Sequence, residues 1–139
     1  MLTTTLLHPE ILSALGSAGH GSRVLIADGN YPFSTGSNPS ARRVFLNLRP
    51  GLVSAVDVLQ CLVPVIPVET AFVMVPDKGP EPPIFSEFRR ILPGSTPMEK
   101  KARFAFYDEA RTPDVALVIA TAEQRVYANI LLVIGVVQP

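Results

Sequence analysis

Apolar residues recur every three or four positions in four stretches of the chain, which is the spacing of one helix face. They predict one helix that starts at Pro9 and ends at Gly16, and three more over residues 52–63, 84–92 and 104–110. In the second helix the predicted apolar stripe consists of Leu52, Val56, Leu59 and Val63. Residues 100–103 are expected to lead into the last helix.

Other apolar residues form short unbroken runs, as in strands that are covered on both faces. These runs predict strands over residues 24–27, 70–75, 115–120 and 128–137, and a weaker alternation predicts one over 44–48. Strands that alternate with helices indicate an α/β domain with a partly parallel central sheet. No repeat and no long linker divides the chain, so we expect one domain over residues 1–139.

The charged residues balance, with 12 Lys and Arg against 12 Asp and Glu and a formal net charge of zero. Without a basic patch, no nucleic-acid partner is expected, and the low charge suits an uncharged ligand or an associating surface. The longest apolar run, Ile130–Val137, is far shorter than the ~20 residues of a membrane span. Residues 1–16 lack the basic start of a signal peptide, so we expect a cytoplasmic protein with no membrane partner. The single cysteine, Cys61, excludes an intrachain disulfide and is expected to be a small core residue.

His20 suggests chemistry because glycines flank it, in the turn between a helix and a buried strand. Glycines leave a neighbouring side chain accessible, although a loop histidine with no role fits the pattern equally well. His8, beside Pro9, is expected to be solvated or to cap the first helix. Asp28 follows the 24–27 strand, at the kind of sheet edge where open α/β folds bind ligands. It either serves a ligand or caps its own Asp28-Gly29-Asn30 turn.

Three further polar residues stand beside apolar elements. Arg103 precedes the 104–110 helix, whose aromatic residues are expected to be core, and it either contacts a ligand or pairs with Asp108. Tyr127 and Asn129 open the last predicted strand on one face, and a buried asparagine there needs a hydrogen-bond partner. The chain has no histidine pair for zinc, no glycine-rich phosphate loop and no nucleophile elbow, so neither a metal nor an organic cofactor is expected.

Four segments lie in a recognisable order along almost the whole chain. They are Ala18-Gly19-His20-Gly21, Ala27-Asp28, Arg103-Phe104-Ala105-Phe106-Tyr107, and Tyr127-Ala128-Asn129-Ile130-Leu131-Leu132 with Gly135-Val136. Together they resemble the RbsD/FucU family of ribose pyranases and L-fucose mutarotases, and the third segment is similar to the fucose branch. The chain departs from that branch at Leu48-Arg49-Pro50-Gly51-Leu52, where an Arg-Ala-Asp-Gly-Leu run is usual.

The resemblance implies a single compact RbsD-like domain with a mixed, partly parallel sheet flanked by helices. It implies an isomerase, a mutarotase that interconverts the anomers of L-fucose or a related monosaccharide, with His20 as the proton donor and no cofactor. Four residues match substrate-binding positions: Asp28, Arg103, Tyr127 and Asn129. Family members form homo-oligomers, from dimers up to decamers, with the site near a subunit contact.

Mutarotation opens a sugar ring and closes it again, with one proton delivered to the ring oxygen and one removed from the anomeric hydroxyl. A histidine side chain serves either step near neutral pH, so His20 is the expected general acid or base. Asp28 would assist catalysis by orienting it, or would bind sugar hydroxyls, and the planar donors of Arg103 suit sugar oxygens. One alternative is a non-catalytic monosaccharide-binding or transport-accessory protein with the same pocket. Another is a purely structural oligomer module, which leaves the glycine-flanked histidine unexplained.

Overall fold

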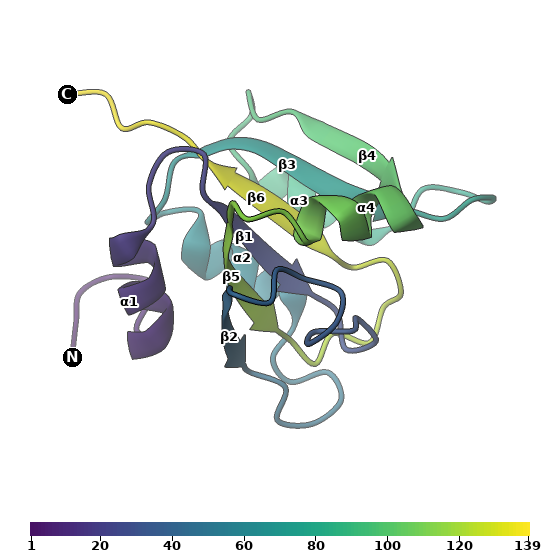
Figure 1. Cartoon of the computed structure of the whole chain (residues 1–139), viewed down its shortest axis with the longest axis horizontal. Helices are drawn as coiled ribbons and strands as arrows, with labels where there is room; N and C mark the ends of the chain where they lie inside the picture. The colour runs from purple at the N-terminus through teal and green to yellow at the C-terminus, as the bar shows by residue number, and fades with distance from the viewer.

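A six-stranded mixed sheet forms the middle layer of the protein in the computed structural model, which describes all of residues 1–139 (Figure 1). The strands lie in the order β2-β5-β1-β6-β3-β4. Their bounds are β1 Arg23–Ala27, β2 Arg42–Phe45, β3 Val68–Val75, β4 Met98–Ala102, β5 Val115–Ala120 and β6 Ile130–Ile134. The helices are α1 Pro9–Ser17, α2 Ala55–Leu62, α3 Ile84–Ile91 and α4 Arg103–Ala110.

One strand runs against the other five. β6 pairs antiparallel with β1 and with β3, whereas β1 with β5, β2 with β5, and β3 with β4 are parallel. Figure 1 shows the arrow of β6 pointing opposite to those of β1 and β4. The carboxyl ends of five strands and the amino end of β6 therefore meet at one edge of the sheet, which we call the carboxyl edge; the opposite edge is the amino edge. The mixed, partly parallel sheet of the predicted α/β fold is confirmed.

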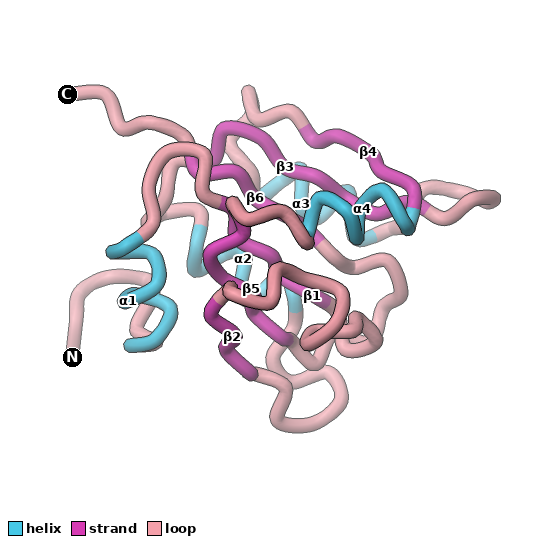
Figure 2. Tube along the Cα trace, in the orientation of Figure 1, coloured by secondary structure: helices cyan, strands magenta, loops and turns pink.

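Both faces of the sheet are covered, as the unbroken apolar strands predict. Helices α1, α2 and α3 pack on one face around a cluster of 23 buried residues. On the other face α4 and the loop between β1 and β2, pink in Figure 2, enclose a cluster of 11. Successive residues of β1 alternate between the two, since Ile26 belongs to the first cluster and Leu25 to the second. No helix has both the length and the apolar character needed to cross a bilayer.

The second predicted helix begins later than expected, and its predicted stripe is only partly confirmed. Ser54 forms a capping box with Asp57, so α2 starts at Ala55 and Leu52 lies outside it, exposed. The buried residues of α2 are Ala55, Val58, Leu59 and Leu62. Of the predicted stripe, Leu59 is fully buried and Val56 and Val63 are partly buried against the same core cluster, because the helical phase is set by the cap rather than by Pro50-Gly51.

Strand β4 is absent from the sequence prediction, which placed part of it in the approach to α4. Its sequence, MEKKA, has no apolar alternation, because it lies at the sheet edge with little of it buried. Lysines on an edge strand also discourage pairing with another chain. Phe104, expected in the core, is 74% exposed. The last strand ends at Ile134, and Val136 and Val137 beyond it are exposed.

Glu109 of α4 fastens this helix to the sheet. Its carboxylate accepts a hydrogen bond from Nη1 of Arg23 at 2.5 Å and lies 3.6 Å from Nζ of Lys101. The two cations also lie over the ring of Phe72, at 5.4 and 5.1 Å from its centroid. The hydrogen bond from Arg23 outweighs partial burial and holds the pKa of Glu109 below its ordinary value. The ionised carboxylate therefore stabilises the folded state.

Replacing Glu109→Gln removes this charge, and we expect the free energy of unfolding near pH 7 to fall by about 1–3 kcal/mol. Because the folded pKa is lowered, the stabilisation is complete above the ordinary value of 4.5 and is lost as the pH falls through the folded value. Urea denaturation should show that the variant's free energy of unfolding differs less from that of the wild type near pH 3 than near pH 7. The control is Glu99→Gln, which should change the free energy of unfolding less near pH 7, because Glu99 lies 3.9 Å from Nζ of Lys101. An equal loss at both pH values would contradict the assignment.

Candidate functional site

Four of the five predicted site residues line one cavity at the carboxyl edge. This cavity, which we call the Asp28 cavity, has a volume of about 270 Å³. It is lined by Asp28, Asn30, Tyr31, Met74, Arg103, Tyr107, Val126, Tyr127 and Asn129. Its residues come from the loop after β1, the end of β3, the start of α4 and the loop between β5 and β6, because all four segments reach the carboxyl edge.

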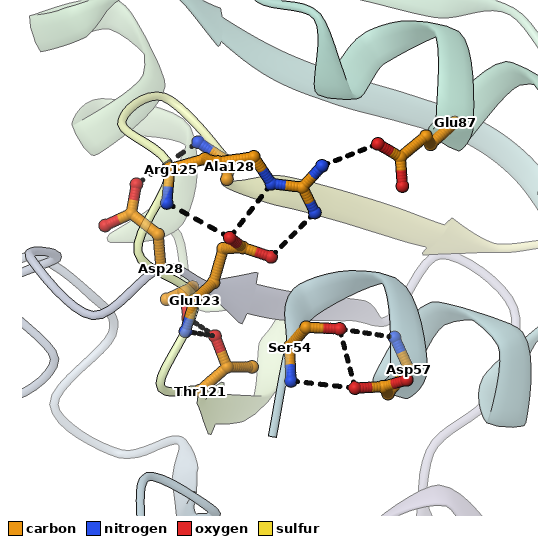
Figure 3. A network of polar contacts seen from close by, with 9 residues as sticks. Asp28, Ser54, Asp57, Glu87, Thr121, Glu123, Arg125 and Ala128 are labelled. Atoms are coloured by element: carbon orange, nitrogen blue, oxygen red, sulfur yellow. Dashed lines mark hydrogen bonds and ion pairs between the residues drawn. The ribbon is translucent and has the colours of Figure 1, made fainter. Parts of the chain in front are cut away.

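Asp28 is buried and joins two of these segments. Its Oδ2 accepts hydrogen bonds from the backbone N–H of Ala128 at 3.2 Å (Figure 3) and from Nδ2 of Asn129 at 2.9 Å. In return, the backbone N–H of Asp28 donates to Oδ1 of Asn129 at 2.7 Å. Its Oδ1 accepts from the N–H of Asn30 at 3.0 Å, so the predicted turn cap is present as well. Asn129 is buried and has its partner, as the sequence required.

These bonds limit what the Asp28 carboxylate can still do. A carboxylate has about four acceptor positions, and three are used within the chain. Burial raises the pKa of Asp28 above its ordinary value, while the hydrogen bonds from Asn30, Ala128 and Asn129 oppose the rise. The arrangement leaves about one lone pair for a hydroxyl group of a ligand. Asp28 is therefore better suited to fixing and binding than to carrying a proton through a reaction.

Tyr127 and Asn129 precede β6 rather than opening it, yet both line the cavity. Tyr127 is the one non-glycine residue with a left-handed backbone, at φ 58°. Such a conformation costs about 1–3 kcal/mol and persists only where the surroundings enforce it. Conformations of this kind cluster at ligand sites, which adds to the reasons for placing the site here.

Arg103 lies in the first turn of α4 and pairs with Tyr107 rather than with Asp108. Its Nε is 3.3 Å from the hydroxyl of Tyr107, and its guanidinium lies 5.6 Å from the ring centroids of Tyr107 and Phe104. Tyr107 is a cavity residue that the sequence analysis treated as core. The signal was available in principle, since residues four apart on a helix share a face. The sequence alone does not distinguish Tyr107 from its aromatic neighbours, Phe104 and Phe106.

His20 is the predicted site residue that the chain does not bring to the Asp28 cavity. It precedes β1 and lies at the amino edge, whereas Asp28 follows β1. A strand of five residues spans roughly 16 Å, so the imidazole and the cavity stand on opposite edges of the sheet. The imidazole Nε2 lies 3.3 Å from Oε2 of Glu69, and the two side chains are 59% and 52% exposed.

Glu69, which the sequence analysis did not single out, is held toward His20 by a β-bulge. Val68 pairs with Ile134 and Thr70 with Val133, so Glu69 is the extra residue of β3, and such bulges redirect side chains. Gly135 packs against it closely, since a Cβ there would lie 3.2 Å from Cβ of Glu69. Nothing in the sequence connects two residues 49 positions apart, so only the fold reveals this pair.

A second cavity, of about 470 Å³, opens beside the first at the carboxyl edge. It is lined by residues 47–50 and 121–124 together with Gly29 and Asn30, and Asn30 borders both cavities. None of the predicted site residues lines it. The Asp28 cavity is therefore the candidate site, although it is the smaller of the two.

Known proteins include relatives that span nearly the whole chain. The chain is 31% identical to the fucose mutarotase of Danio rerio over 147 residues, which cover 97% of this chain and 92% of the relative. It is 33% identical to the D-ribose pyranase of Proteus mirabilis over 136 residues, covering 94% and 95% of the two chains.

The fold is also that of a solved relative. The crystal structure of the fucose mutarotase from Streptococcus pneumoniae, in complex with L-fucose, superposes with a TM-score of 0.84. The superposition covers 99% of this chain and 100% of the Streptococcus pneumoniae chain. At 24% sequence identity, this match is evidence for the fold alone. The family model of the RbsD / FucU transport protein family matches residues 1–137. The predicted resemblance is thereby confirmed, and the chain belongs to the RbsD / FucU transport protein family.

Proposed function

We propose that this protein is a sugar mutarotase that interconverts the anomers of L-fucose or a related monosaccharide by ring opening and reclosure. The observation that carries the proposal is the Asp28 cavity, where Asp28, Arg103 and Asn129 converge from separate segments. Its amide and phenol groups both donate and accept hydrogen bonds and its guanidinium donates them, which suits sugar hydroxyls. Relatives that span nearly the whole chain are named fucose mutarotase and D-ribose pyranase, which supports the reaction class.

The wall of the cavity favours a deoxysugar. Met74 and Val126 form an apolar part of the lining beside the polar groups. L-Fucose carries a methyl group at C5 of its pyranose ring, whereas a pentose carries none. A methyl group placed against Met74 and Val126 is removed from water, which is favourable. This is the reason for preferring L-fucose to ribose.

The proposed chemistry requires a proton donor that the cavity of one chain lacks. Three phenols line it, those of Tyr31, Tyr107 and Tyr127, but no histidine does, and the hydroxyl of Tyr31 already donates to the carbonyl of Gly36. The carboxylate of Asp28 is largely occupied by internal hydrogen bonds. We infer that a second copy supplies His20, whose protonated imidazole delivers a proton to the ring oxygen while the proton of the anomeric hydroxyl passes to solvent, with Glu69 orienting the imidazole. Phe104 and Val126, 74% and 63% exposed beside the cavity, would be covered by that copy.

This contact joins the amino edge of one copy to the carboxyl edge of the next. Such a head-to-tail contact uses two different surfaces, and it closes into a ring when the rotation permits. The proposed assembly is a homo-oligomer, from a dimer to a decamer, with the site at a subunit contact. Cytoplasmic location and the absence of a cofactor remain parts of the proposal.

A non-catalytic sugar-binding or transport-accessory protein is the second candidate. The observation that favours it is the distance of His20 from the cavity, because one chain alone has the binding groups without the imidazole. A binder would keep its affinity for sugar when His20 is replaced. A mutarotase would lose anomer exchange under the same change.

The wild-type protein is expected to speed exchange between the anomers of L-fucose, measured by saturation-transfer NMR. D-Arabinose, which differs from L-fucose by the missing methyl group, should be accepted about tenfold less well, because one apolar carbon in a partly apolar site contributes on the order of 1–3 kcal/mol. The variant Val126→Ser should reduce the ratio of the exchange rates for L-fucose and D-arabinose. Equal acceptance of the two sugars would refute the role of the apolar wall. No acceleration for any pentose or deoxyhexose would refute the mutarotase proposal.

If His20 acts in a neighbouring copy, two inactive variants should recover anomer-exchange activity when they assemble together. His20→Ala is expected to lose roughly 10²–10⁴-fold in exchange rate, and Tyr107→Phe is expected to lose activity through the cavity. When the two are unfolded and refolded together, about a quarter of the contacts combine an intact His20 with an intact cavity. Recovery of about that share of wild-type activity is the expected result. Mixed assemblies that form yet stay inactive would show that His20 does not act across the contact.

A further inference from the structure

The loop between β5 and β6 passes over Asp28, and its two ends are tied down by backbone hydrogen bonds. At the first end, the N–H of Thr121 donates to the carbonyl of Ala27 and the N–H of Gly29 donates to that of Glu123. At the second end, the N–H of Ala128 donates to Asp28. Between them, no hydrogen bond within the chain uses the backbone of Gln124, Val126 or Tyr127. The middle of the loop, residues 124–127, therefore depends on something other than its own backbone.

Arg125 supplies the attachment (Figure 3). Its Nε and Nη2 each donate to one oxygen of Glu123 at 3.0 Å, and its backbone N–H donates to Oε1 of the same carboxylate at 3.0 Å. Its Nη1 donates to Glu87 of α3 at 2.5 Å. A planar, two-pronged contact of this kind fixes orientation as well as distance. Arg125 thus links the loop to a helix of the core.

Glu123 gives this attachment a rigid base. Its side chain is 6% exposed, and it follows β5 by three residues. Burial alone would raise the pKa of Glu123, but hydrogen bonds from Arg125 and from the backbone N–H of Ala55 outweigh burial and hold it below its ordinary value. Ala55 is the first residue of α2, where a helix favours negative charge. The carboxylate is therefore ionised and held in place near neutral pH.

Tyr127 stands between the two fixed points of the loop. Arg125 precedes it by two residues, and Ala128, held by Asp28, follows it. Its left-handed backbone, at φ 58°, needs surroundings that enforce it. Val126, the apolar wall of the Asp28 cavity, lies in the same stretch. Release of Arg125 would free both cavity residues from one side while leaving the sheet and the helices intact.

We propose that Arg125 is a positioning residue, which holds Tyr127 and Val126 against the sugar through its contacts with Glu123 and Glu87. This inference rests on the proposed function in one respect, because it requires that the cavity binds a sugar. The role is separate from acid–base chemistry, because the guanidinium does not line the cavity. Its loss would therefore weaken binding rather than the chemical step.

The test compares Arg125→Ala with Arg89→Ala. Arg89 is a matched control, since it lies on α3, forms a two-pronged ion pair with Glu81, and is 46% exposed against 42% for Arg125. Arg125→Ala is expected to raise the KM for L-fucose about tenfold with kcat changed less than about threefold. Arg89→Ala should leave both constants unchanged, and the melting temperatures of the two variants should agree. Equal KM values for the two variants would overturn the proposal.

Amide hydrogen exchange tests the same positioning without a sugar. Arg125→Ala should speed exchange at the backbone N–H of Ala128, which is bonded to Asp28, by about tenfold, whereas Arg89→Ala should not. Glu87→Gln, which leaves Glu123 bound, should have a smaller effect of the same kind. Unchanged exchange in Arg125→Ala would overturn the proposal. If amide exchange at Ala128 is faster in Arg125→Ala but the wild-type protein accelerates anomer exchange of no sugar, the positioning role stands and the mutarotase function is refuted.

Discussion

The hydrogen bonds of Asp28 are the constraint on which the carboxyl edge depends. A buried carboxylate must find donors, and those of Asp28 come from its own turn and from the segment just before β6. The reciprocal bond to Asn129 fixes where β6 starts relative to the end of β1. Removing one partner would leave a buried polar group unsatisfied, which costs about 1–3 kcal/mol. The bonds that hold two strands in register therefore also build the wall of the cavity.

The direction of β6 explains why these groups meet at all. Had β6 run parallel to β1, the segment before it would lie at the amino edge, far from Asp28. Because it runs antiparallel, the loop from β5 crosses the end of β1 directly. Strand β4 runs parallel to β3 and ends at the same edge, so α4 begins there and presents Arg103 and Tyr107. The cavity thus follows from one reversed strand in an otherwise parallel sheet.

The parts of the molecule governed by neighbours in sequence could be predicted, and those governed by long-range packing could not. Asp28 and Asn129 stand out because each is polar beside an apolar run. Strand β4 escaped prediction because an edge strand needs no apolar face, and the phase of α2 was set by the Ser54 cap. The pairing of Glu69 with His20 depends on a bulge in β3 and on the packing of Gly135, neither of which leaves a local pattern.

The separation of His20 from the Asp28 cavity has a consequence for how activity relates to protein concentration. In the proposed arrangement each working site exists only while two copies are joined, so the fraction of sites follows mass action. Dilution below the dissociation constant of the contact would silence the enzyme without unfolding any chain. A molecule that covers Phe104 and Val126 would have the same effect from outside the sugar pocket. The abundance of the protein, and not only that of its sugar, would then set the rate in the cell.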